Sequence, residues 1–95
     1  MATLLSSATA NGAGTGASHS AGATVFVTGV FDGATVTVEV SADDTTYVKA
    51  DNVSVVTPSR LVAPGVCRVD CTGDYYIRCV VSGVGSATDI DAEST

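Results

Sequence analysis

The segment Ala34-Thr35-Val36-Thr37-Val38-Glu39-Val40-Ser41 decides the fold, because a valine occupies every second position from residue 36 to residue 40. Side chains of a β-strand point alternately to its two faces, so this spacing places all three valines on one side. We expect a strand over residues 34–41 whose valines face the core, while Thr35, Thr37 and Glu39 face water. The composition agrees: sixteen valines and thirteen threonines stand against three leucines, and β-branched residues favour strands.

Further segments rich in strand-forming residues surround this one, and turn residues separate them every eight to twelve positions. The expected strands cover residues 3–7, 23–29, 34–41, 45–50, 53–57, 60–63, 66–71, 75–82 and 86–91. Pro58 places the segment around it at a sheet edge or in a loop, because proline cannot donate to a strand ladder. Many short strands of this kind predict an all-β fold, a small antiparallel β-sandwich that is immunoglobulin-like or related.

The length, net charge and hydropathy of the chain exclude some classes of function. Its 95 residues suffice for one domain. Four basic residues against ten acidic ones give a net charge of −6, which repels phosphate backbones, so nucleic acid is excluded as the main partner. No apolar run approaches the ~20 residues that span a bilayer, and residues 1–10 lack the regions of a secretory signal, so we expect neither membrane segment nor export. A mean hydropathy of +0.37 indicates apolar surface that other subunits cover.

The beginning of the chain differs from the rest. Leu4 and Leu5 are its only large apolar side chains, within a short expected strand, and residues 8–22 are mostly Gly, Ala, Ser and Thr. Such residues bury too little apolar surface to offset their ordering entropy. We expect an arm over residues 1–22, either flexible or ordered only by contact, and a sandwich domain over residues 23–95. Leu4 and Leu5 are then candidate interface residues, because another chain can complete an unpaired edge strand.

The expected strands over residues 66–71 and 75–82, which residues 72–74 join, are predicted to pair as a hairpin. A three-residue loop sets Cys67 opposite Cys79 and Val69 opposite Ile77, so that apolar residues meet on one face. This register also fixes which side chains share the outward face of the hairpin.

That outward face carries charged and aromatic side chains. Arg68 lies opposite Arg78, with Asp70 and Tyr76 alongside, so half of the four basic residues share one patch. Like charges directly opposite each other cost stability unless Asp70 or an acidic partner offsets them. The four residues are a candidate interface; the alternative is a solvated face with a local ion pair.

The three cysteines raise the questions of a disulfide and of a metal. Cys67 and Cys79 could bridge as a cross-strand pair, whereas Cys67 and Cys71 lie about 13 Å apart on one strand. Without an export signal, buried thiols that act as small apolar side chains are favoured over a disulfide. Zinc would need a fourth ligand, and the only histidine, His19, lies in the expected arm. We expect no metal and no cofactor.

No set of residues predicts catalysis. Residues 12–17 fit a dinucleotide-binding glycine pattern, but that pattern needs a preceding strand and a following helix, and residues 18–22 show no helical period. Ser18 and Ser20 flank His19 without the oriented geometry of a catalytic triad. We expect the chain not to be an enzyme.

Acidic residues gather at the expected turns. Asp43 and Asp44, with Asp32 or Asp51 nearby, leave a calcium ion open as an alternative. Their spacing matches no calcium-binding loop, and Asp side chains commonly bond the backbone two residues on. Turn-forming, solvated carboxylates are therefore favoured.

Several segments resemble small virion proteins of tailed bacteriophages, in which a strand and turn read Gly-Ala-Thr-Val-Thr, a hydrophobic residue, any residue, Val-Ser, any residue and Asp. The segments that carry this resemblance are residues 11–14, 23–29, 31–48, 63–69 and 76–83. Together they cover most of the chain. The resemblance implies an immunoglobulin-like or related sandwich without enzymatic activity.

The resemblance also implies a role in the virion. The chain is then a capsid decoration (cement) protein that binds the outer shell by protein–protein contacts, or a neck or tail component. Its partners are the major capsid protein or other virion proteins, and it forms a homo-oligomer, with a trimer suiting local capsid symmetry. The alternative is a carbohydrate or cell-surface binding module, although no Trp, three Tyr and two Phe offer little aromatic platform.

Overall fold

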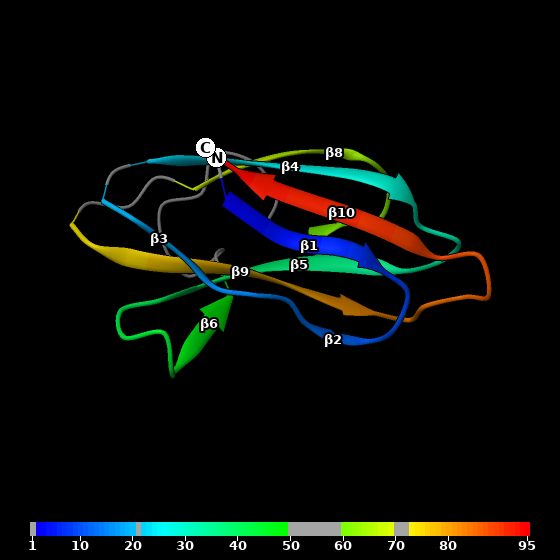
Figure 1. Cartoon of the computed structure of the whole chain (residues 1–95), viewed down its shortest axis with the longest axis horizontal. Coiled ribbons are helices and arrows are strands. Elements are labelled where there is room, and N and C mark those ends of the chain that lie inside the picture. Colours follow the sequence, from blue (N-terminus) through cyan, green and yellow to red (C-terminus); the bar gives the residue numbers. More distant parts are fainter. Residues whose placement is uncertain (1, 21, 50–59, 70–72) are drawn as a thin grey trace.

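The computed structural model describes residues 2–20, 22–49, 60–69 and 73–95. Within them the chain forms strands and no helix, which confirms the prediction of an all-β fold (Figure 1). The strands are β1 (Ala2–Ala8), β2 (Gly12–Ala13), β3 (Ala17–His19), β4 (Ala23–Val30), β5 (Thr35–Ser41), β6 (Tyr47–Lys49), β7 (Arg60–Leu61), β8 (Gly65–Val69), β9 (Tyr75–Ser82) and β10 (Asp89–Ser94).

The strands form two antiparallel sheets packed as a small sandwich. Sheet A has the order β1-β10-β4-β8. Sheet B has the order β2-β9-β5-β6, with β3 also pairing with β9 and β7 with β5. Figure 1 shows the long strands of the two layers stacked above one another, with the start of β1 beside the end of β10. Each sheet therefore has an inner face toward the core and an outer face toward solvent.

The core lies between the sheets and is lined as the alternation predicted. Val36 and Val38 are 0% exposed and Val40 is 5% exposed, so all three valines of the deciding segment face inward. Burying an aliphatic side chain of this size stabilises the fold by about 1.5–3 kcal/mol. Their neighbours in the core include Leu4, Val25, Val27, Val69, Ile77, Cys79, Val81, Ile90 and Ala92.

Most expected strands are present, with shifted ends. β4 and β5 match their expected segments closely, whereas β6 and β7 are only three and two residues long. The expected strand over residues 53–57 lies outside the described residues. The last strand begins at Asp89 rather than at residue 86, because the preceding residues form a turn in which the Gly85 amide donates to Thr88 Oγ1 at 2.9 Å.

The N-terminal segment differs from the expected arm, because it contributes strands to both sheets. β1 pairs with β10, beginning with Ala2 opposite Ser94, and β2 and β3 pair with β9. Leu4 and Leu5 are only 1% and 6% exposed, so they belong to the core and not to an interface. The Thr15 amide donates to the Leu4 carbonyl oxygen at 3.1 Å, which joins the two sheets at this side.

The small side chains of this segment have a structural reason. A Cβ on Gly14 would overlap the Leu4 carbonyl oxygen and lie 2.7 Å from Leu5 Cδ2. The Gly14 amide donates to the Cys79 carbonyl oxygen at 2.8 Å. Backbone hydrogen bonds to strands that are already ordered offset the entropy that the side chains alone could not. The composition of residues 8–22 did not predict this order, because it reflects only the segment's own apolar surface.

The predicted C-terminal hairpin is also wrong. β8 pairs with β4 in sheet A and β9 pairs with β5 in sheet B, so the two strands belong to different layers. The inward residues were nevertheless identified: Cys67, Val69, Ile77 and Cys79 are each 0% exposed. Alternation fixes which residues face the core, and it is satisfied equally by a neighbour in the same sheet or by a strand across the core.

Candidate functional site

The predicted interface residues do not form one patch. Arg68 lies on the outer face of sheet A, where it pairs with Thr24 of β4. Arg78 lies in sheet B together with Tyr76, so the two arginines are on opposite sides of the sandwich. Asp70 lies outside the described residues. The two arginines lie apart because β8 and β9 are not neighbours in either sheet.

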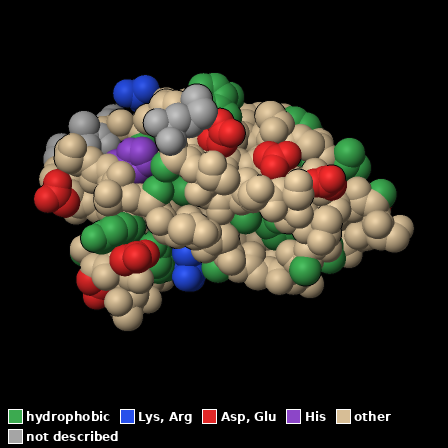
Figure 2. Space-filling view, in the orientation of Figure 1, with side chains coloured by type: hydrophobic (Ala, Val, Ile, Leu, Met, Phe, Trp, Pro, Cys, Tyr) green, Lys and Arg blue, Asp and Glu red, His purple; other side chains and the backbone are tan. Residues whose placement is uncertain are grey.

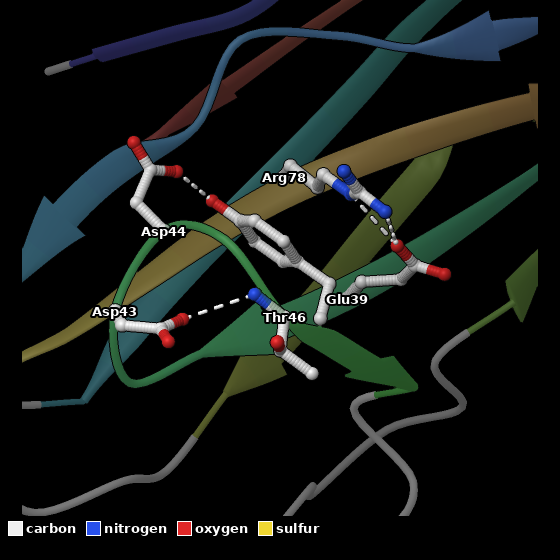
Figure 3. Close-up of polar contacts among 6 residues, drawn as sticks. Glu39, Asp43, Asp44, Thr46 and Arg78 are labelled. Carbon is white, nitrogen blue, oxygen red and sulfur yellow. Dashed lines mark hydrogen bonds and ion pairs between the residues drawn. The ribbon is translucent and has the colours of Figure 1, made fainter.

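The outer face of sheet B is held by contacts among its own side chains (Figure 3). Arg78 bonds Glu39 through Nη2 at 2.7 Å and through Nε at 2.8 Å. The Arg78 guanidinium carbon also lies 4.0 Å from the centroid of the Tyr47 ring, a cation–π contact. The Tyr47 hydroxyl donates to Asp44. Burial, followed by this bond to Asp44, raises the pKa of Tyr47 to about 12, so the phenol keeps its proton.

The adjoining turn uses a second carboxylate. Asp43 Oδ1 accepts hydrogen bonds from the Thr45 and Thr46 amides, each at 3.0 Å, and from Ser41 Oγ at 2.9 Å. The bond from Thr46, with smaller contributions from Thr45 and Ser41, lowers the pKa of Asp43. Asp43 is thus a turn-forming residue. In the described part of the chain no three His, Cys, Asp or Glu side chains lie close enough to hold a metal ion.

The outer face of sheet A is different, because large apolar side chains are exposed there. Phe26 of β4 lies directly opposite Val66 of β8, and they are 44% and 46% exposed. Val30, further along β4, is 54% exposed. These three are the majority of the five large apolar side chains that are exposed among the described residues. Such a patch commonly marks a surface that another molecule covers.

Acidic side chains line the same face on the next strand. In β10, Asp89, Asp91 and Glu93 point outward at alternate positions and are all exposed. They pair across with Val30, Thr28 and Phe26 of β4, respectively. Figure 2 shows acidic side chains following one another along β10. We call this surface the β4–β10 face and define it as Phe26, Thr28, Val30, Val66, Asp89, Asp91 and Glu93.

The β4–β10 face was missed because its residues lie on three strands that are distant in the sequence. The alternation of residues 23–29 did place Phe26 between inward-facing Val25 and Val27, and this was the available signal. The expected last strand ended at residue 91, which left Glu93 outside it.

His19 is part of sheet B and not of a flexible arm. Its Nε2 is hydrogen-bonded to Oγ of Ser94 at 2.8 Å, and Ser94 is fully buried in sheet A. Burial lowers the pKa of His19. Beside it lies an open cleft of about 500 Å³, lined by Ser18, His19, Ser20, Asp74, Tyr75 and Tyr76.

The described cysteines are Cys67 and Cys79, which are buried, lie on opposite sheets and are not joined by a disulfide. Burial raises the pKa of Cys79 to about 12. A thiol with so high a pKa is a poor nucleophile, because the thiolate is the reactive form. Cys71 lies outside the described residues.

The chain matches no family model, and no curated protein or solved structure is detectably similar to it. None of the described residues belongs to a helix long and apolar enough to cross a membrane. The exposed apolar and acidic β4–β10 face is thus the feature on which a function can be based.

Proposed function

We propose that the chain is a non-catalytic structural protein that docks through the β4–β10 face onto a larger assembly. The observation that carries this proposal is the exposure of Phe26, Val30 and Val66 on one sheet face. Most large apolar side chains of the described residues are buried, and these three are placed where a partner can remove them from water. Each Å² of apolar surface so covered stabilises the complex by about 25 cal/mol before the costs of association.

The assembly in this proposal is a tailed-bacteriophage virion, in which the chain decorates the outer capsid. The resemblance in residues 31–48 supports this choice. The partners are the major capsid protein or other virion proteins, bound in several symmetric copies. A docking face on sheet A leaves sheet B, with its internally bonded side chains, directed away from the shell.

Binding to a particle tests the proposal directly. The purified chain is expected to co-sediment with expanded empty capsids of the phage that encodes it. Val66→Ser should weaken this binding at least about fivefold, the effect of losing about 1 kcal/mol on truncation of an interface side chain. Val48→Ser is the matched control, since Val48 on β6 is also 46% exposed but belongs to sheet B. No co-sedimentation, or equal losses from both variants, contradicts the proposal.

The cleft beside His19 favours a second candidate function, a saccharide-binding module. Its lining offers the hydroxyls of Ser18 and Ser20, the Asp74 carboxylate and the half-buried Tyr76. Hydroxyl and carboxylate groups beside an aromatic ring suit a polyhydroxylated ligand. Titration of neutral monosaccharides against ¹⁵N-labelled protein tests this function. Shifts confined to residues 18–20 and 74–76 that Asp74→Asn abolishes support it, and their absence removes it.

A further inference from the structure

We propose that the β4–β10 face binds an extended segment of its protein partner through arginine side chains, one of which enters a hollow between β4 and β10. This inference rests on the proposed docking through this face and adds the chemistry of what docks. Three features of the face lead to it: the size and lining of the hollow, the spacing of the carboxylates and their excess over cations.

The hollow has the size and lining that a single arginine side chain requires. It measures about 130 Å³ and is lined by Phe26, Thr28, Asp91, Ala92 and Glu93. This is well below the roughly 300–1,000 Å³ of sites that hold drug-sized ligands. An aromatic ring beside two carboxylates matches a planar guanidinium, which stacks on rings and forms paired hydrogen bonds with carboxylates. A lysine ammonium is not planar and cannot form the same paired hydrogen bonds.

The spacing of the acidic residues indicates an extended partner. Asp89, Asp91 and Glu93 occupy alternate positions of β10, so their side chains repeat every ~6.7 Å. Alternate residues of another extended segment have the same repeat. Arginines at those positions would meet one carboxylate each, and their aliphatic stems would cover the apolar side chains one strand away, at Phe26 and Val30.

On the described outer face of sheet A, the three carboxylates of β10 outnumber the cations, since Arg68 lies on β8, two strands away. The ion pair between Arg78 and Glu39 lies on the opposite sheet. Asp91 Oδ1 accepts a hydrogen bond from the Ser7 amide at 2.9 Å, which orients the carboxylate but adds no positive charge. Three like charges in a row repel one another, and a partner that supplies cations relieves the repulsion. Charge complementarity thus selects a basic partner.

A peptide titration tests the inference without the whole partner. The probe is an acetylated, amidated pentapeptide with arginine at positions one, three and five and serine between them. The matched controls carry glutamine or lysine in place of arginine. Amide shifts of ¹⁵N-labelled protein are expected in β4 and β10 with the arginine peptide, weaker binding with lysine, and none with glutamine. Equal binding of the lysine peptide, or shifts outside β4 and β10, overturns the inference.

Two variants locate the site on the protein. Asp91→Asn combined with Glu93→Gln keeps the shape of the face and the acceptor for Ser7 but removes two charges. We expect at least about a fivefold loss of peptide affinity, the scale of one to two exposed charge pairs. Asp74→Asn, which removes an exposed charge at the start of β9, should leave affinity unchanged. Equal losses from both changes would mean that net charge alone drives binding, and they overturn the inference.

The peptide result and the capsid result separate the two proposals. Capsid binding without arginine-peptide binding retains docking through sheet A and rejects its arginine chemistry. Peptide binding without capsid binding retains the arginine site and rejects the capsid as the assembly.

Discussion

On the outer face of sheet B, Arg78 bonds Glu39 and lies over Tyr47, and Tyr47 in turn donates to Asp44. On the outer face of sheet A, Asp91 and its acidic neighbours in β10 meet Thr28 and apolar side chains instead of cations. On the first face, polar side chains bond one another and so link β5, β6 and β9. The second face leaves Phe26 and Val30 exposed to solvent, beside three carboxylates for which no ion pair is found within the described residues. The difference teaches that composition alone does not mark a binding face; what matters is whether its charged groups are already paired and its apolar groups already covered.

The largest expected loss of stability comes from disrupting the contact at residues 14 and 15 that joins the two sheets. Gly14→Ala forces a Cβ against the Leu4 carbonyl oxygen, and backbone must move to accommodate it. Because overpacking costs 1–3 kcal/mol or more, we expect a loss of about 3 kcal/mol in the free energy of unfolding, measured with urea. Gly65→Ala is the control, since its Cβ would lie 3.4 Å from Leu61 Cδ2 and 3.8 Å from the Ala63 carbonyl oxygen, without overlap. Equal stability of the two variants would show that residues 14–15 do not join the sheets.

A smaller loss is expected from the face of sheet B. Arg78→Gln removes a partly exposed ion pair and a cation–π contact, which together stabilise by about 1 kcal/mol. Arg60→Gln removes an exposed charge from β7 of the same sheet and should change stability by less than about 0.5 kcal/mol. Urea unfolding of both variants measures the difference. If Arg78→Gln also reduced capsid binding, the outer face of sheet B would take part in docking, and the two faces would not differ in function.

The bond between His19 and Ser94, which joins the sheets, predicts a modest pH dependence. Burial lowers the pKa of His19, so the unfolded chain binds the proton more tightly than the folded one. Stability is therefore unaffected well above the unfolded pKa of 6.5 and falls as pH drops below it, toward the folded pKa. His19→Gln should lose less stability than the wild type between about pH 7.5 and about pH 5. Identical pH profiles in thermal unfolding would contradict this.

The smallest effect on stability is expected on the face of sheet A. Phe26→Thr places a strand-favouring β-branched residue in β4 and removes a ring that is 44% exposed. We expect a change within about 0.5 kcal/mol in the free energy of unfolding, as for ordinary surface positions, although capsid binding falls. A large loss of stability would mean that Phe26 serves the fold, and the contrast between the faces would then weaken.

Local pattern predicted much of the fold and little of the candidate site. The alternation around Val36 in sheet B, and that around Val69 in sheet A, identified inward residues correctly. The same alternation placed Arg68 beside Arg78, because it contains no information about which strand is the neighbour. The prediction of a single interface patch was therefore wrong, since a surface patch is made by neighbouring strands.

The glycine- and alanine-rich beginning of the chain shows a second limit. Leu4 was expected at an interface, yet it is 1% exposed in the core. Segment composition measures the apolar surface that a stretch brings with it. It does not measure the backbone hydrogen bonds that existing strands offer, such as the bond from Gly14 to Cys79.

The amino-acid sequence by itself determined that the chain is all-β and which side chains of each long strand face inward, because a period of two is a local property of the strand. Only the tertiary structure decided that β10 lies between β1 and β4, and so that an acidic row borders Phe26 and Val30. Pairing between distant strands is settled by the packing of the whole sandwich, and any strand with a matching apolar face satisfies the local pattern equally well.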